Sequence, residues 1–211
     1  MPIPRLIETH DDLNEGLAFL CQQEPRFQLA HKICEPLELR RQEDGFDRLL
    51  SAIVSQQLSV AAARTIWQRV INAGITSPEA IKACDDDSLR QLGLSKQKIG
   101  YARSLANANI DFLALRYMST QEVIDTLIKV KGVGVWTAEI YAMFSLGHAD
   151  VFAHNDLALQ EGTRLLFQLE QRPSLKDMRT IAAQWQPWRA VAARLLWAYY
   201  AHCKVTSSTK A

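Results

Sequence analysis

Two glycines and one aspartate of this sequence combine residue types and a separation along the chain that suit a catalytic site. Gly132 and Gly134 frame a turn between two helical patterns, and the carboxylate of Asp156 follows 22 positions after Gly134. Glycine lets the backbone turn tightly and approach a ligand without a Cβ in the way. Main-chain amides at such a turn, beside a helix N-terminus, suit an anion such as a phosphate. The turn therefore predicts a phosphate anchor, and Asp156 offers the carboxylate that cleavage of a glycosidic bond requires.

Helical patterns run along nearly the whole chain and must position these residues. Apolar side chains recur at helical spacing, for example at Phe46, Leu49, Leu50, Ile53 and Val54. Residues that can cap a helix N-terminus precede several such runs, namely Ser59, Ser77, Ser95, Ser119 and Ser174. Strand signals are sparse, so the sequence predicts an all-α protein of roughly ten short helices.

The composition is that of an ordinary globular protein. The 211 residues are 48% hydrophobic and 22% charged, which suits one large domain or two small lobes. No apolar run reaches transmembrane length, and the first residues lack the pattern of a signal peptide, so a cytosolic location is expected. The cysteines form no cluster, which favours neither zinc, nor an iron–sulfur cluster, nor a disulfide; they are Cys21, Cys34, Cys84 and Cys203.

The net charge of +1 conceals an uneven distribution. Residues 1–47 carry 5 Lys or Arg and 10 Asp or Glu, so the remainder carries +6. The segment from Lys96 to Gly134 contains three acidic residues and six basic ones, namely Lys96, Lys98, Arg103, Arg116, Lys129 and Lys131. Solvated helix faces are the simpler interpretation. A polyanionic partner would have to be bound by a local patch.

Four segments of the chain carry a family resemblance. They are residues 53–61, residues 92–95 with Lys98, residues 130–138 and residues 185–189. Together with Asp156 they resemble the helix-hairpin-helix superfamily of DNA glycosylases, and within it the alkylpurine (3-methyladenine, type II) branch. The match covers about residues 46 to 200, and four ordered motifs with an aspartate are more specific than a lone glycine pair.

The resemblance implies a two-lobed all-α fold with the active cleft between the lobes. One lobe would comprise residues 1–45 and 150–205 and the other residues 46–149, with a frayed tail at 205–211. Larger members carry an additional N-terminal β-domain, for which this chain is too short, so the resemblance is to the compact form.

Asp156 would be the catalytic residue of such an enzyme. The bond between base and deoxyribose breaks through an oxocarbenium-like state, whose positive charge a fixed carboxylate stabilises while it orients or deprotonates water. Asp156 also precedes an apolar periodic segment, so an ordinary helix N-cap is the competing interpretation. Some relatives have a second acid where this chain has Asn155, which leaves Asp156 as the only candidate.

Trp136 decides the reaction subtype under the same resemblance. Relatives that also cut the strand place a lysine two residues after the second hairpin glycine, where this chain has Trp136. An indole forms no Schiff base. The resemblance therefore implies a monofunctional hydrolase that leaves an abasic site.

Aromatic and amide side chains would bind the damaged base once it is flipped out of the duplex, and would fill the gap that it leaves. Trp136, Tyr141 and Trp188 are candidate walls of a pocket for a cationic alkylated purine, through cation–π attraction; each is alternatively a core residue. Gln57 is the candidate wedge that fills the gap in the base stack, with Gln56 as a pocket or flanking contact. Two exposed glutamines at a helix end are the simpler interpretation.

The hairpin would bind phosphates without reading sequence. The candidate DNA contacts, besides Gln57, are Ser59, Lys131, Gly132, Val133, Gly134, Thr137 and His154. His154 is alternatively structural. In this superfamily hairpin carbonyls often hold a monovalent cation (Na⁺ or K⁺), by position those of Ile128, Val130 and Val133. No other cofactor is implied.

The sequence thus favours a base-excision repair glycosylase for alkylated purines in damaged double-stranded DNA, active as a monomer and without a membrane partner. It would work in a bacterial cytosol, or in the nucleus of a eukaryote. A helix-hairpin-helix protein that binds distorted DNA without catalysis is the second hypothesis. A glycosylase for deaminated, oxidised or mismatched bases is the third. A helical scaffold is the fourth, and it leaves the hairpin glycines unexplained.

Overall fold

A computed structural model describes residues 4–208 of the chain. Within this range every named element is a helix, and one isolated bridge pairs Leu6 with His148. The all-α prediction is therefore confirmed. None of the helices described is long and apolar enough to cross a membrane.

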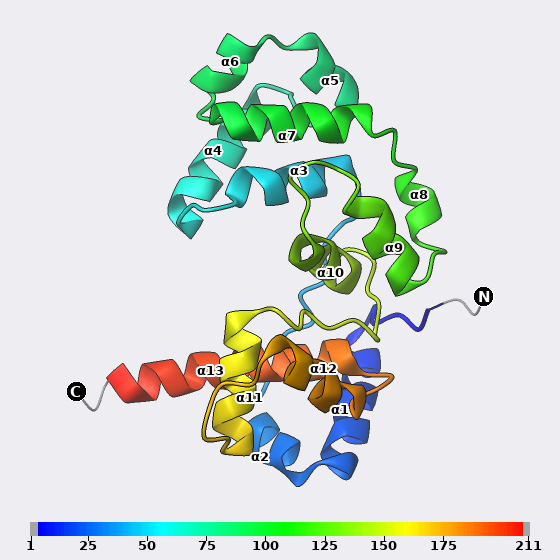
Figure 1. Cartoon of the computed structure of the whole chain (residues 1–211), viewed down its shortest axis with the longest axis vertical. Helices are drawn as coiled ribbons and strands as arrows, with labels where there is room; N and C mark the ends of the chain where they lie inside the picture. The colour runs from blue at the N-terminus through cyan, green and yellow to red at the C-terminus, as the bar shows by residue number, and fades with distance from the viewer. Residues whose placement is uncertain (1–3, 209–211) are drawn as a thin grey trace. The chain divides into compact units, whose positions relative to one another are not determined.

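The chain folds into two compact units, residues 42–141 and residues 4–41 with 142–208 (Figure 1). The first contains α3 (Phe46–Ser55), α4 (Val60–Asn72), α5 (Pro78–Ala83), α6 (Asp86–Gln91), α7 (Lys96–Asn107), α8 (Phe112–Leu115), α9 (Thr120–Leu127) and most of α10 (Val135–Phe144). The second contains α1 (His10–Gln23), α2 (Pro25–Cys34), α11 (Leu157–Phe167), α12 (Leu175–Ala183) and α13 (Arg189–Ser208).

The boundary between the units falls inside α10, ahead of the expected position at residue 149. The residues after it are bound by the N-terminal segment of the chain. The Ile7 amide donates to the Gly147 carbonyl at 2.7 Å, and the Ala149 amide donates to the Arg5 carbonyl at 2.9 Å. The segment that leads to Asp156 is thereby part of the second unit.

The predicted capping residues begin their helices. Each of the five serines accepts a hydrogen bond from an amide in the first turn of its helix, namely α4, α5, α7, α9 or α12. Ser119 and Glu122 form a complete capping box. Since a cap contributes about 1 kcal/mol, local sequence fixes where these helices start.

The frayed tail expected from residue 205 is wrong for the described part, because α13 continues to Ser208. The hydroxyls of Thr206 and Ser207 donate to the Cys203 carbonyl at 3.0 and 2.8 Å. Both hydroxyls thus bond to a carbonyl of the preceding turn, a contact that Ser and Thr side chains make within helices. Residues 209–211 lie outside the described range.

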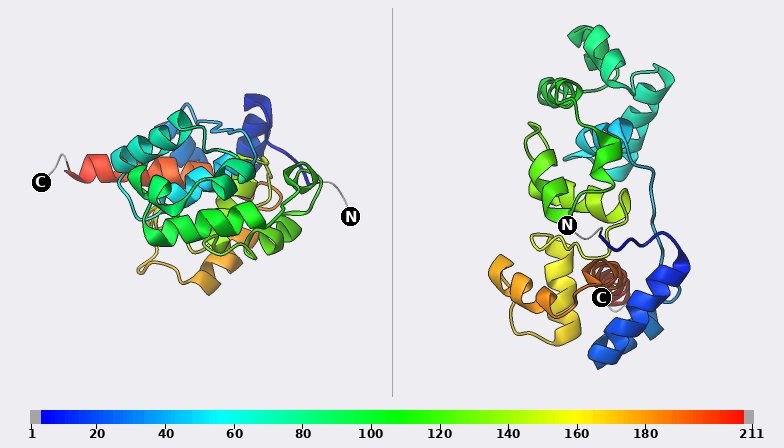
Figure 2. Two further views of the ribbon diagram at one scale, coloured as in Figure 1. Left: turned by 90° about the horizontal axis from the view of Figure 1, so that it is seen from above. Right: turned by 90° about the vertical axis from the view of Figure 1, so that its right-hand side faces the viewer.

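In the second unit α13 packs against α11, α2 and α1 (Figure 2). Gly162 permits the close approach of α11 to α13, because a Cβ there would lie 2.8 Å from the Leu196 carbonyl oxygen. The rings of Phe27, Phe152 and Trp185 meet in the core at centroid distances of 5.3 and 5.4 Å from Trp185. This packing fixes the start of α11, where Asp156 lies, against α13.

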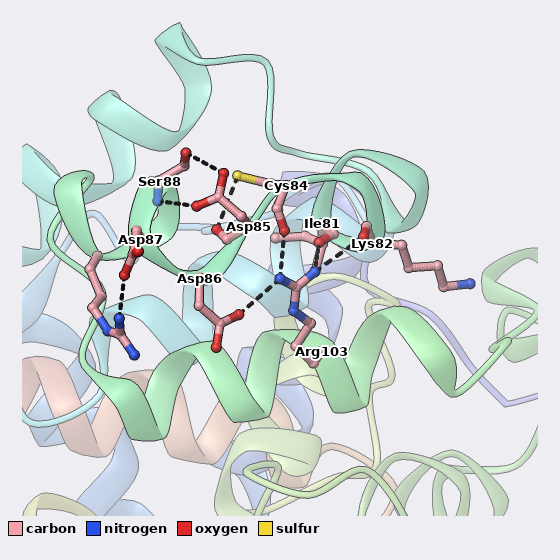
Figure 3. Close-up of polar contacts among 9 residues, drawn as sticks. Ile81, Lys82, Cys84, Asp85, Asp86, Asp87, Ser88 and Arg103 are labelled. Atoms are coloured by element: carbon pink, nitrogen blue, oxygen red, sulfur yellow. Dashed lines mark hydrogen bonds and ion pairs between the residues drawn. The ribbon is translucent and has the colours of Figure 1, made fainter.

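In the first unit α7 is the platform for the hairpin. It packs on α3, α5 and α6. The Arg103 guanidinium donates to the carbonyls of Ile81, Lys82 and Cys84 and binds the Asp86 carboxylate at 2.9 Å (Figure 3). One side chain thereby satisfies carbonyls at the end of α5 and holds the α5–α6 segment on α7.

Candidate functional site

The predicted hairpin is present between α9 and α10. The Val130 amide donates to Leu127 at 3.1 Å and the Val133 amide donates to Val130 at 3.0 Å, so the chain turns within a few residues. Gly132 has φ +97, and a Cβ on it would lie 2.5 Å from Cδ2 of Tyr101 on α7. Real Cβ atoms do not come so close, so only glycine fits this turn.

Three hydrogen bonds hold the hairpin and the end of α3 on their neighbours. The Lys131 amide donates to Ser104 Oγ at 3.0 Å, and Lys98 Nζ donates to the Val54 carbonyl at 2.6 Å. Gln56 Nε2 donates to the Gly132 carbonyl at 2.8 Å. Gln56 is therefore a brace between the end of α3 and the hairpin, and its contact with a base stays a prediction.

Beyond the turn the hairpin is open. A Cβ on Gly134 would meet no described atom within 4 Å, and α10 starts at the next residue, where the first amides have no acceptor within the helix. Trp136 is 47% exposed in this first turn. Thr137 is only 8% exposed and the Val133 side chain 5%, so any contact of either with a phosphate would use the main chain.

The turn between α3 and α4 presents Gln57. This residue is exposed and has φ +57, a conformation rare for a side chain with a Cβ. The turn is closed by the Leu58 amide on the Ser55 carbonyl at 3.3 Å. Ser59 Oγ accepts from the Ala62 amide at 3.3 Å, so its hydroxyl caps α4. Insertion of Gln57 as a wedge and DNA contact by Ser59 both stay predictions.

In the second unit Asp156 is the N-cap of α11. Its Oδ1 accepts from the amides of Ala158 and Leu159 at 2.9 and 3.0 Å. The same oxygen accepts from Nε1 of Trp197 at 3.2 Å. Asp156 therefore is a helix N-cap, as the competing interpretation expects. The Trp197 indole is a third donor, which capping does not require. Three donors fix the orientation of the carboxylate.

Trp197 is the site residue that sequence reasoning missed. It lies on α13, 41 residues from Asp156. Its ring stacks on Phe144 with centroids 5.9 Å apart and planes at 29°, and the Arg194 guanidinium lies 4.7 Å from the centroid of the Phe144 ring. The only signal in the sequence was an indole on the last helix, and no local motif joins it to the aspartate.

The segment before Asp156 is anchored on both sides. Arg189 binds Asp150 through Nε at 2.6 Å and Nη2 at 3.1 Å. Gln160, which is 6% exposed, donates from Nε2 to the carbonyl of His154 at 3.0 Å. The half-buried His154 ring lies 5.2 Å from that of Phe152. His154 thus has a structural role at the main chain, and DNA contact by its ring stays a prediction.

Two aromatic pocket candidates, Trp188 and Tyr141, are buried as the alternative core interpretation expects, and their contact with a base stays a prediction. Trp188 is 3% exposed, with Arg5 lying 4.3 Å from its ring centroid and Gly16 packed so closely that a Cβ would lie 2.7 Å from the ring. Tyr141 is 4% exposed and its hydroxyl accepts from the Gly45 amide at 2.8 Å. Burial raises the pKa of Tyr141 well above its usual value. Of the three aromatics, only Trp136 presents an accessible ring.

Several of the basic residues are engaged within the first unit. Arg116 binds Asp44 with both Nε and Nη2, at 2.7 and 2.6 Å, while Lys98 and Arg103 bind main-chain carbonyls. Lys129 and Lys131 are exposed at the hairpin. Within residues 4–208 no group of three His, Cys, Asp or Glu side chains is arranged to hold a metal ion.

Trp197→Phe is expected to slow catalysis while leaving the fold intact. Phenylalanine keeps a ring against Phe144 but removes the Nε1 donor to Asp156, so the carboxylate loses one of its three restraints. A charge-assisted hydrogen bond contributes about 1.5–3 kcal/mol, so kcat should fall roughly tenfold or more. Single-turnover base release and thermal unfolding measure the two effects. An unchanged rate would contradict the positioning role of Trp197.

The comparisons with known proteins agree with this geometry. The family model described as HhH-GPD superfamily base excision DNA repair protein matches residues 50–187. The crystal structure of a DNA-3-methyladenine glycosidase from Bacillus halodurans has a TM-score of 0.80 and 33% identity, and the match covers 88% of each chain. A 3-methyladenine DNA glycosylase of Schizosaccharomyces pombe in complex with abasic DNA has a TM-score of 0.75 and 29% identity, over 87% of this chain and 95% of that chain.

A curated relative from Bacillus subtilis is 29% identical over 165 residues. The match covers 72% of this chain and 58% of the relative, so the chain spans less than two thirds of that relative's length.

Proposed function

The chain belongs to the HhH-GPD superfamily of base excision DNA repair proteins, and we propose that it is a DNA glycosylase for alkylated purines. It would hydrolyse the N-glycosidic bond of bases such as 3-methyladenine and 7-methylguanine in double-stranded DNA. The observation that carries the proposal is the Asp156 carboxylate, which three donors hold in one orientation.

Asp156 is proposed to act on the sugar and not on the base. Positive charge develops near C1′ as the bond to the base breaks, and a fixed carboxylate stabilises that charge without reorganisation. The same group orients or deprotonates the attacking water. A purine alkylated at N3 or N7 is cationic and leaves readily, so no general acid is needed to protonate it.

The reaction is proposed to stop at the abasic site. Cutting the strand would need an amine that forms a Schiff base with the sugar. The position two residues after Gly134 holds Trp136, whose indole cannot form one. The exposed ring of Trp136 is instead suited to stacking on a cationic base.

DNA is proposed to bind through the hairpin and the α3–α4 turn. The open backbone at Gly134 and the exposed Lys129 and Lys131 suit phosphates, and Gln57 would fill the gap left by the extruded base. Affinity should fall steeply with salt, because phosphate contacts release counterions. We expect the protein to act as a monomer, since one lesion is processed at a time.

A monovalent cation at the hairpin is part of the proposal. The carbonyls of Ile128, Val130 and Val133 would hold it, and the Val130 oxygen, which accepts one hydrogen bond at 3.0 Å, has a second lone pair for it. Replacing Na⁺ and K⁺ by tetramethylammonium at constant ionic strength should lower DNA affinity. Unchanged affinity would contradict the cation site.

A helix-hairpin-helix protein that binds DNA without catalysis is the second candidate, because the hairpin alone would suffice for binding. A duplex that carries methylated purines separates the two. Chromatography detects the free base, and denaturing electrophoresis, before and after alkali, detects uncut and abasic strands. Released base with strands that break only after alkali supports the glycosylase. Salt-sensitive binding without released base supports the binding protein, and release of a neutral deaminated base alone would shift the substrate class.

A further inference from the structure

A cavity of about 170 Å³ lies in the second unit, between the start of α13 and the segment that follows α2. Its lining contains none of the residues proposed to bind or cleave DNA; it consists of Pro36, Leu37, Glu38, Arg40, Arg194 and Ala198. Three of the six lining residues are charged, with the guanidinium groups of Arg40 and Arg194 and the carboxylate of Glu38.

Arg194 is the buried charge of this cavity. The residue is 3% exposed, and its guanidinium donates only to main-chain carbonyls, those of Leu39 at 3.2 Å, Ala190 at 2.9 Å and Met143 at 3.3 Å. Within residues 4–208 no carboxylate pairs with it. A buried cation that is balanced only by carbonyl dipoles is costly, and an arginine has five donor hydrogens. Three bonds therefore leave donor capacity for a ligand.

The surrounding charges add to the positive potential. Arg41 donates from Nη1 to the carbonyls of Phe144 and Ser145, so it too is paired with dipoles. Burial, together with the charges of Arg41 and Arg40, lowers the pKa of Arg194 to about 9. Burial is the larger cause of this shift, and the repulsion from Arg41 and Arg40 adds to it.

Arg40 is held at the cavity in a strained conformation. Its φ is +52, in the left-handed region that is unfavourable for a residue with a Cβ. Its Nε binds Glu38 at 2.8 Å, and both side chains are more than half exposed. The Glu38 carboxylate is thus the one acid in the lining of this cavity, against the two guanidinium groups of Arg40 and Arg194. Strain retained in a non-glycine residue frequently marks a functional position.

We propose that this cavity binds a phosphate-type oxyanion, with Arg194 as the buried donor and Arg40 as the exposed one. Guanidinium groups present paired N–H donors that match the oxygens of such an anion. The anion would also offset the charge of the buried Arg194 guanidinium, whose hydrogen bonds go to main-chain carbonyls. The oxyanion is either free phosphate or a phosphate of the DNA backbone, and the chemistry of recognition is the same for both.

The test uses inorganic phosphate and the variant Arg40→Gly. Glycine removes the guanidinium and also suits φ +52, so the fold should be retained or stabilised. A ligand that binds the folded state raises its unfolding temperature in a saturable way. In wild type, phosphate titrated against chloride at constant ionic strength should produce this shift. Arg40→Gly should weaken phosphate affinity about tenfold, as loss of one charge-assisted contact predicts.

Two control variants isolate the effect. Arg179→Ala removes an exposed arginine on α12, and Asn109→Gly places glycine at another position of positive φ, φ 48, without a change of charge. Both should respond to phosphate as wild type does. An equal phosphate response in Arg40→Gly and wild type would overturn the proposal, and so would the absence of a saturable response in wild type.

A second arm identifies the source of the oxyanion. Binding to undamaged duplex DNA is measured over a range of salt concentrations for wild type and Arg40→Gly. If Arg40→Gly weakens DNA binding and lowers the salt slope by about one, the site holds a backbone phosphate. If DNA binding is unchanged while the phosphate response is lost, the site takes free phosphate. This readout does not depend on base release.

Discussion

Asp156→Asn is expected to abolish base release while DNA binding is retained. Asparagine is as good an N-cap as aspartate, and its oxygen can still accept from Ala158, Leu159 and Trp197. What disappears is the negative charge that would stabilise the oxocarbenium-like state. Loss of one such electrostatic contribution costs on the order of 10²–10³-fold in rate. Single-turnover release of methylated purines measures the loss, and anisotropy of labelled duplex measures binding.

The matched control is Asp85→Asn. Asp85 is the N-cap of α6 and accepts from the Ser88 amide at 2.7 Å, so the same substitution is made at another helix start. Its base release should equal that of wild type. Asp156→Asn with wild-type activity would mean that the aspartate is only a cap, and the catalytic role would have to be abandoned.

Gly132→Ala is expected to have the largest effect on stability and on DNA binding together. The added Cβ would lie 2.5 Å from Cδ2 of Tyr101, and φ +97 is unfavourable for alanine. Strain of this kind costs about 1–3 kcal/mol, and overpacking adds a similar amount. The free energy of unfolding should fall by about 2–6 kcal/mol, and DNA affinity should fall with it because the hairpin must shift. Urea unfolding and duplex titration measure both.

Gly134→Ala separates folding from binding. Here the Cβ would meet no described atom within 4 Å, so stability should change little. If Gly134 is the point where the backbone approaches a phosphate, DNA affinity should fall nonetheless. Equal stability losses in the two variants, or wild-type DNA affinity in both, would contradict the distinct roles assigned to the two glycines.

Helix starts were predictable because they are decided locally. Ser59, Ser77, Ser95, Ser119 and Ser174 each bond an amide within three residues, and such contacts are visible in sequence. The hairpin and the N-cap at Asp156 were predictable for the same reason.

Which aromatic side chains belong to the site was not predictable. Trp188 directly precedes α13, and Trp197 lies nine positions further along the chain, within that helix. The first is 3% exposed in the core and the second donates to Asp156. No local pattern distinguishes the two indoles, and only tertiary packing shows which of them meets the aspartate.

The roles of the two glutamines could not be separated from sequence either. Gln56 binds a carbonyl 76 residues away, at Gly132, while its neighbour Gln57 is exposed with positive φ. A long-range bond of this kind leaves no local pattern. The structure thus assigns bracing to one amide and leaves the other for the proposed wedge.

The proposed function is tested most directly by the release of free base from methylated duplex DNA by the wild-type protein, measured together with strand integrity. We expect free 3-methyladenine or 7-methylguanine, and strands that break only after alkali. Tight, salt-sensitive DNA binding without any released base would contradict catalysis by Asp156, and strands cut without alkali would contradict the monofunctional mechanism.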